Sequence, residues 1–209
     1  KDKIVVLPNG ISRNYIEEEL VAHNESEKIV VSFVGRMEWY KGIQNVIKAL
    51  GNIKKEFSNF EFVVMGRAGK YVQTLKEIVT QNNLEKQIRF IFSPTDEERD
   101  KILYEESQIT ILPSKWEGTG ISLIEGMGKG NVIVSTNQND ALSMIIKPGI
   151  SGYSYDFANN LELQKILLKL FTDYNLRQKI RAYNLEFAKT FTWESIFPEY
   201  LKLVSSLIV

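Results

Sequence analysis

The chain has 209 residues, 44% of them hydrophobic, which is enough for one large buried core or two small ones. Basic and acidic residues number 26 each, so no overall field attracts nucleic acid or an anionic membrane surface. Cysteine is absent, which excludes thiolate chemistry and disulfides and fits a reducing compartment, so we expect a cytoplasmic protein. The single histidine, His23, lies in a polar run, so we expect it on the surface and predict no histidine-based triad or metal site.

Short β-branched runs alternate with longer segments of helical period, a pattern that predicts a parallel sheet covered by helices. The expected strands are at residues 4–8, 29–34, 60–65, 88–92, 109–113 and 132–135, and the expected helices between them are at 42–57, 71–82 and 96–106. After residue 157 only helices follow, at about 159–173, 175–189 and 193–207. We therefore expect one α/β unit over residues 1–209, with helices on both faces of the sheet and a helical tail from about residue 158.

The turns after three of these strands are where we expect function, because an open parallel sheet binds ligands at the carboxyl ends of its strands. They read "GRMEWYKG" (35–42), "GRAG" (66–69) and "SKWEGTG" (114–120), and each combines glycine with charged side chains. Glycine lets backbone N–H groups approach a ligand, and a helix starting near Thr119 would aim its positive dipole end at the cleft. Arg36 and Lys41 add two cations, so the expected guest is a diphosphate.

The common phosphate-binding fingerprints fail in this stretch. A G-x-G-x-x-G motif through Gly118 and Gly120 would need glycine at position 123, where the chain has Leu123, and a Walker loop fails at the same position. No D-x-D is present to hold a divalent metal on the diphosphate, so we predict no metal site.

The ordered motifs resemble a known enzyme family. "PNGI" (8–11), "GRMEWYKG" (35–42), "VVMGRAG" (63–69), "PSKWEGTGISLIEGMGKG" (113–130) and "FTWESIFPEYLKLV" (191–204) resemble the carboxyl-terminal half of group 1 glycosyltransferases, which are retaining enzymes of GT-B fold. The resemblance implies a Rossmann-like sheet, one half of the GT-B fold. It also implies transfer of a hexose from a UDP-, GDP- or ADP-sugar without a metal or another cofactor.

The resemblance further implies roles for single residues. Arg36 and Lys41 would hold the diphosphate and stabilise the negative charge that grows as the glycosidic bond breaks. Glu117 would lie near the donor hexose, and Glu125 would accept both ribose hydroxyls. Further ligand contacts are expected from the backbone of Gly118, Thr119 and Gly120 and from Gly35 and Gly66, although Gly66 and Gly69 are equally consistent with a role in forming the turn.

Three residues depart from the family pattern, and two tryptophans beside the expected site have no predicted role in it. Asn139 and Asp140 stand where the family usually has a glycine pair, and Met144 where it has a glutamate, so the identity of the donor stays open. Trp39 and Trp116 lie beside the expected site, and no role is predicted for them.

The resemblance implies that the acceptor binds mainly to an amino-terminal domain, which we expect to be missing from this chain. We expect the chain alone to bind a nucleotide-sugar without transferring it, and we expect peripheral membrane contact only in the full-length protein. The apolar residues of the last helix would cross back towards the missing domain and should be partly exposed here; they are Trp193, Phe197, Tyr200, Leu201 and Val204. Two alternatives stay open, a nucleotide-sugar epimerase-like domain and a non-catalytic interaction module of the same fold.

Overall fold

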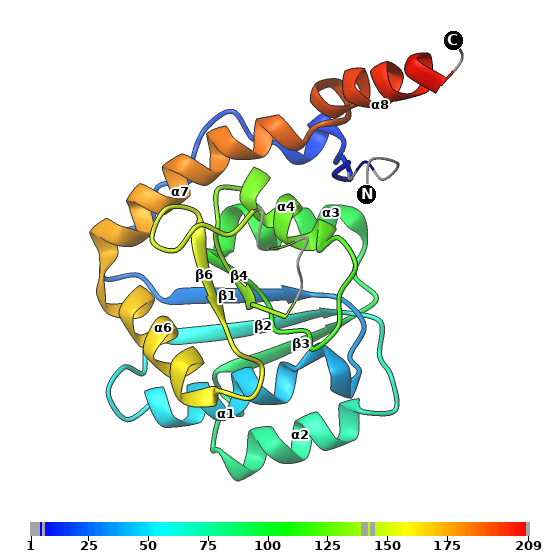
Figure 1. The fold of residues 1–209 in the computed structure, drawn as a ribbon. Helices are drawn as coiled ribbons and strands as arrows, with labels where there is room; N and C mark the ends of the chain where they lie inside the picture. The colour runs from blue at the N-terminus through cyan, green and yellow to red at the C-terminus, as the bar shows by residue number, and fades with distance from the viewer. Residues whose placement is uncertain (1–4, 6, 139–141, 143–144, 208–209) are drawn as a thin grey trace.

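A parallel sheet forms the centre of the computed structural model, which describes residue 5, residues 7–138, residue 142 and residues 145–207 (Figure 1). In the described part the sheet has six strands in the order β3-β2-β1-β4-β5-β6. They are β1 (Ile29–Val34), β2 (Phe60–Gly66), β3 (Ile88–Phe92), β4 (Ile109–Leu112), β5 (Val132–Thr136) and β6 (Gly152–Tyr155). The carboxyl ends of β1, β2 and β4 therefore lie together at one edge, as the alternation of strands and helices predicts.

Helices cover both faces of this sheet (Figure 1). One face carries α1 (Ile43–Ile53), α2 (Val72–Gln81) and α6 (Asn160–Thr172); the other carries α3 (Asp96–Lys101), α4 (Ile121–Gly128) and α7 (Tyr174–Ala188). The strands need apolar residues on both sides because both faces of the sheet are covered. Val64 packs in the cluster that contains α1, whereas its neighbours Val63 and Met65 pack with Ile102 and Leu103 on the other face. The last helix, α8 (Trp193–Leu207), extends away from the body (Figure 1). No helix of the described residues has the length and apolar character needed to cross a bilayer.

Most of the predicted elements are confirmed. Five of the six expected strands form with ends within one residue of those predicted, and the three tail helices form as α6, α7 and α8. The strand expected at 4–8 is wrong for residues 5, 7 and 8, which are irregular; residues 4 and 6 lie outside the described residues. The short strand β6 was not expected, because its sequence Gly-Tyr-Ser-Tyr lacks a β-branched run. It pairs so closely with β5 that a Cβ on Gly152 would lie 1.9 Å from the Ile133 carbonyl oxygen.

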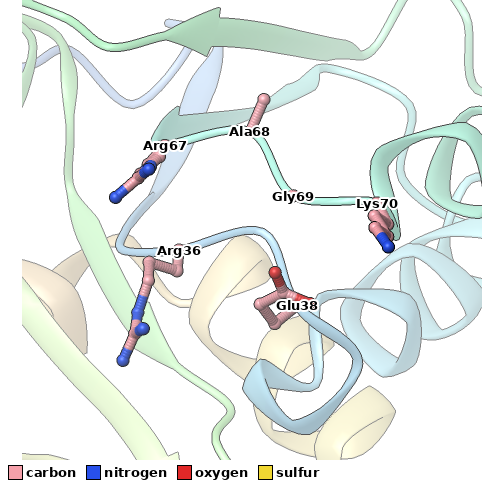
Figure 2. Close-up of a pocket in the computed structure, with 6 residues that line it drawn as sticks. All are labelled: Arg36, Glu38, Arg67, Ala68, Gly69 and Lys70. Atoms are coloured by element: carbon pink, nitrogen blue, oxygen red, sulfur yellow. The ribbon is translucent and has the colours of Figure 1, made fainter.

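The loops after β1 and β2 continue side by side beyond the sheet (Figure 2). Val34 lies opposite Met65 at the strand ends. The Gly35 N–H then donates to the Met65 carbonyl at 3.0 Å, and the Met37 N–H donates to the Arg67 carbonyl at 3.0 Å. These backbone bonds fix the two loops against each other.

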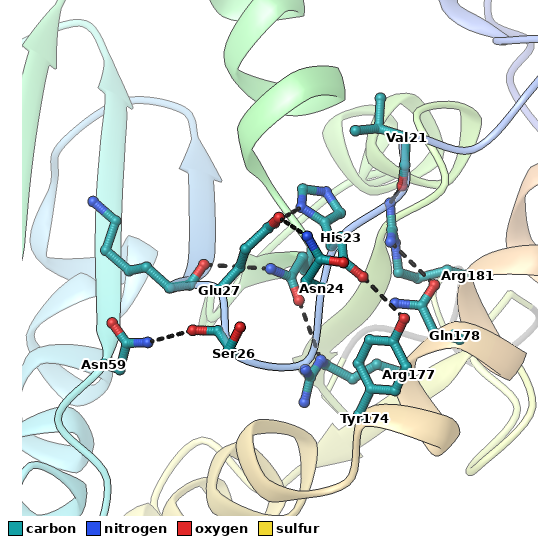
Figure 3. A network of polar contacts seen from close by, with 12 residues as sticks. Val21, His23, Asn24, Ser26, Glu27, Asn59, Tyr174, Arg177, Gln178 and Arg181 are labelled. Carbon is teal, nitrogen blue, oxygen red and sulfur yellow. Dashed lines mark hydrogen bonds and ion pairs between the residues drawn. The ribbon is translucent and has the colours of Figure 1, made fainter.

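The segment that precedes β1 is anchored by a buried polar network on α7 (Figure 3). Arg177 and Arg181 are 1% and 0% exposed, and each donates to carbonyl oxygens. Arg181 Nε reaches the Gly130 carbonyl at 2.9 Å and its Nη2 reaches the Val21 carbonyl at 3.2 Å. Burial lowers the pKa of Arg181 to about 10, so this guanidinium stays charged at neutral pH and its carbonyl partners stabilise it.

His23 belongs to this network, and the expectation that it lies on the surface is wrong. Its side chain is buried, its Nδ1 lies 3.1 Å from a carboxylate oxygen of Glu27, and its backbone carbonyl accepts a hydrogen bond from the Tyr174 hydroxyl. Burial, followed by the nearby positive charge of Arg181, lowers the pKa of His23. The polar run around His23 is covered by α7, which local polarity alone does not reveal.

We expect protonation of His23 to destabilise the fold. Because the folded-state pKa lies below the unfolded value of 6.5, the stability contribution is present above that value and is lost as the pH falls below it. Urea unfolding between neutral and mildly acidic pH should show this loss, by up to about 1.4 kcal/mol per pH unit for one proton. The free energy of unfolding should depend less steeply on pH in His23→Gln. An equal dependence in the two proteins would contradict the lowered pKa of His23.

Candidate functional site

Two Gly-Arg pairs lie next to each other at the ends of β1 and β2. The register that places Val34 opposite Met65 also places Gly35 and Arg36 beside Gly66 and Arg67. Gly66 has φ of +139°, and a Cβ there would lie 2.0 Å from the Gly35 carbonyl oxygen. Gly66 is therefore required for the close approach of the two loops, while its contact with a ligand stays a prediction.

A pocket of about 510 Å³ opens between these loops, lined by Arg36, Glu38, Arg67, Ala68, Gly69 and Lys70 (Figure 2). In Figure 2 the side chains of Arg36 and Arg67 extend to the same side of the loops, whereas Lys70 lies at the other end. Three cations against one carboxylate make this pocket suited to an anion. Among the described residues, neither Arg36 nor Arg67 forms an ion pair. Arg67 and Lys70 were not predicted, although the repeated Gly-Arg pair on neighbouring strands was a usable signal.

The loop after β4 joins the loop after β1. The Lys115 N–H donates to the Tyr40 carbonyl at 2.8 Å. Lys41 Nζ lies 2.6 Å from Glu117 Oε2, and the side chains are only 12% and 17% exposed. The Ser114 hydroxyl donates to the same carboxylate oxygen at 3.1 Å. Two predicted site residues from distant parts of the chain thus meet in one mostly buried ion pair.

The Gly-Thr-Gly turn follows this ion pair directly. Helix α4 begins at Ile121, two residues later than the expected start near Thr119, because Gly120 has the left-handed φ of +63°. The Thr119 hydroxyl accepts a hydrogen bond from Asn9 Nδ2 at 3.2 Å, which ties the "PNGI" motif to this turn. A Cβ on Gly118 would meet no atom within 4 Å, so its backbone borders open space.

Glu125 lies on the second turn of α4 and has a different environment. Burial raises the pKa of its carboxyl group, and the positive charge of Arg99 on α3 opposes this shift. Arg99 is held by the Tyr15 hydroxyl at 3.0 Å and by Asp100. The structure therefore groups Arg36, Lys41 and Glu117 at the loops after β1 and β4, while Glu125 faces α3. The sequence does not predict that Arg99 lies near Glu125.

Asn139, Asp140 and Met144, at which the chain departs from the family pattern, lie outside the described residues. Within the described ranges, no three histidine or acidic side chains gather as a metal-binding group.

Residues 16–187 match the family described as Glycosyl transferases group 1. The chain belongs to the group 1 glycosyltransferases. An uncharacterized glycosyltransferase of Methanocaldococcus jannaschii is 26% identical over 194 residues, which cover 93% of this chain and 51% of that protein. The chain thus spans about half the length of the curated relatives it matches.

Solved structures share the fold of this chain. The C-terminal domain of the group 1 protein LpcC from Francisella tularensis has a TM-score of 0.74 and 25% identity, with 87% of this chain and 97% of that chain covered. HepE from Anabaena, in complex with UDP and glucose, has a TM-score of 0.83 at 19% identity and covers 97% of this chain and 57% of its own. The Rossmann-like fold of a GT-B carboxyl-terminal domain is confirmed.

The two glycines of the turn provide a matched pair of variants. Gly120→Ala should destabilise the fold by at least about 1 kcal/mol, because an L-residue is strained in the left-handed region. Its Cβ would also lie 2.3 Å from Leu142 Cδ2. Gly118→Ala should change the free energy of unfolding by less than about 0.5 kcal/mol, since nothing surrounds its Cβ. Urea unfolding measures both, and equal effects would contradict the turn geometry.

Proposed function

We propose that this chain is the donor-binding half of a retaining glycosyltransferase, which transfers a hexose from a nucleotide-sugar to an acceptor without a metal ion. The observation that carries this proposal is the contact of Lys41 with Glu117, because Lys41 lies on the same loop after β1 that contributes Arg36 to the cationic pocket. A diphosphate needs the cations and a hexose needs a hydrogen-bond acceptor, and both lie on adjoining loops. Membership of the group 1 glycosyltransferases and the UDP and glucose bound in HepE support this choice of ligand.

The proposed chemistry uses the charges of these loops. As the bond from the sugar carbon to the diphosphate oxygen breaks, negative charge grows on the leaving phosphate, and Arg36 and Lys41 stabilise it. Lys41 exchanges its partner Glu117 for the phosphate. The carboxylate of Glu117 then faces the oxocarbenium-like sugar and orients its hydroxyls. The leaving phosphate oxygen accepts the proton of the acceptor hydroxyl, so no side chain is assigned as nucleophile.

Glu125 is the proposed ribose ligand. An ionised carboxylate accepts two O–H donors, which fits the paired hydroxyls of a ribose. Arg99 favours this ionised form against the burial that raises the pKa of Glu125. Backbone N–H groups of Gly118, Thr119 and Gly120 are proposed to complete the donor site.

The helical tail is proposed to contact an amino-terminal domain. Trp193, Phe197, Leu201 and Val204 are 43% to 53% exposed and follow one another at steps of four, four and three residues, so they form one stripe along α8. The relatives are about twice as long as this chain, which supports a partner domain of the same protein. Without that domain, the chain is proposed to bind the donor but not to transfer it.

We expect the chain to bind at least one of UDP-, GDP- and ADP-glucose in titration calorimetry, with equal affinity in EDTA and in Mg²⁺. Arg36→Ala should weaken binding by roughly tenfold or more, since a cation on the diphosphate is lost. Lys48→Ala is the matched control, because Lys48 is exposed on α1, away from the pocket. Absence of binding by a folded domain would contradict the proposal, and self-association without binding would favour an interaction module.

The affinity should also depend on pH through Glu125. Its pKa is raised, so it takes up a proton at a higher pH than an ordinary glutamate and then no longer accepts two hydroxyl protons. Binding should weaken as the pH falls from neutral through that pKa, and Glu125→Gln should bind weakly with little dependence on pH. The same pH profile in both proteins would exclude Glu125 as the ribose ligand.

A further inference from the structure

An exposed aromatic cluster lies beside the proposed donor site. The rings of Trp39 and Trp116 are 5.4 Å apart at 81°, and Tyr40 lies 6.4 Å from Trp116. Trp39 is 47% exposed and Trp116 is 57% exposed. Rings that keep about half of their surface in solvent contribute little to the core, so packing does not explain their presence here.

The backbone holds this cluster in place. Trp39 begins a short 3-10 turn, and its carbonyl accepts the Gly42 N–H at 3.2 Å and Gln44 Nε2 at 2.9 Å. The hydrogen bond from the Lys115 N–H to the Tyr40 carbonyl joins the two loops that carry the tryptophans. The backbone that carries the rings is therefore fixed before a ligand arrives, which reduces the entropy cost of binding.

A cation completes the cluster. The Lys115 ammonium lies 4.8 Å from the Trp116 ring centroid and 5.7 Å from that of Trp39. No acidic side chain in the described part of the chain forms an ion pair with it. Indole faces are electronegative and attract the weakly positive C–H groups on the face of a pyranose ring. A neighbouring ammonium can donate to the hydroxyls or to a carboxylate at the edge of the same ring.

The position of the cluster identifies which sugar it serves. Trp116 precedes Glu117 directly, and Trp39 is two residues before Lys41. Those two charged residues form the ion pair at which the donor hexose is proposed to lie. A second pyranose stacked on the Trp116 ring would adjoin that hexose, with Trp39 at its edge because the two rings are nearly perpendicular. We propose that Trp39, Trp116 and Lys115 form a subsite for a pyranose ring of the acceptor; only its assignment to the acceptor rests on the proposed function.

Exposed tryptophan beside lysine also occurs where proteins touch a lipid surface. Here the same loops carry Lys41 and Glu117, and a bilayer lying on them would obstruct access to that ion pair. The equal numbers of acidic and basic residues give no overall attraction to anionic lipid. These observations favour a sugar over a membrane.

The chain has 3 tryptophans, so its indole N–H signals in ¹⁵N-correlated NMR provide the test, with Trp193 as an internal control. The probes are methyl α-glucoside, methyl β-galactoside and methyl β-glucuronide at millimolar concentrations, each with and without UDP. We expect at least one glycoside to shift the Trp39 and Trp116 signals saturably and to leave Trp193 unchanged. Trp116→Ala should weaken this binding by roughly tenfold; Trp193→Phe should not. Circular dichroism confirms that the variants fold.

Three results would overturn the subsite. The first is no shift with any glycoside in a protein that binds nucleotide-sugars, and the second is a shift with nucleotide-sugars alone, which would place the donor hexose on the indoles. The third is a shift with vesicles of phosphatidylethanolamine and phosphatidylglycerol but not with glycosides. If glycosides shift the Trp39 and Trp116 signals in a protein that binds no nucleotide-sugar, the sugar subsite is supported and the proposed donor function is contradicted.

Discussion

The ion pair between Lys41 and Glu117 is the contact on which the arrangement of the site depends. It joins side chains 76 positions apart in the chain and links the loop after β1 to the loop after β4. Both side chains are mostly shielded from water, so removing one partner would leave the other as a poorly solvated charge. Each of the two side chains therefore needs either its present partner or a ligand of opposite charge. A diphosphate for Lys41 and a developing cation for Glu117 would satisfy both.

Glycine makes this close approach possible. Gly42 has φ of +71°, and a Cβ there would lie 2.0 Å from the Pro113 carbonyl oxygen, so the loops after β1 and β4 touch only because it has no side chain. Gly66 acts in the same way between the loops after β1 and β2. Because the strands are parallel, the loops after β1, β2 and β4 lie at the same edge of the sheet. Glycine lets the backbones of these loops pack together without side chains between them.

Much of this arrangement follows from sequence patterns. Apolar runs with helical segments between them predict the parallel sheet, and the parallel order then predicts that Arg36, Lys41 and Glu117 lie at one edge. The side-chain contacts do not follow in the same way. Arg99 beside Glu125 and the burial of His23 depend on how α3 and α7 pack, which no local period reveals. The strand β6 was missed for a related reason, since its pairing with β5 compensates for a sequence that has little preference for a strand.

A crystal structure of the domain with a bound nucleotide-sugar would show directly whether the ion pair opens onto the donor. We expect Lys41 Nζ to leave Glu117 and contact a phosphate oxygen, with Arg36 on the same diphosphate and the hexose against the Glu117 carboxylate. A nucleotide-sugar bound elsewhere, with the Lys41 to Glu117 contact unchanged, would contradict this role of the ion pair.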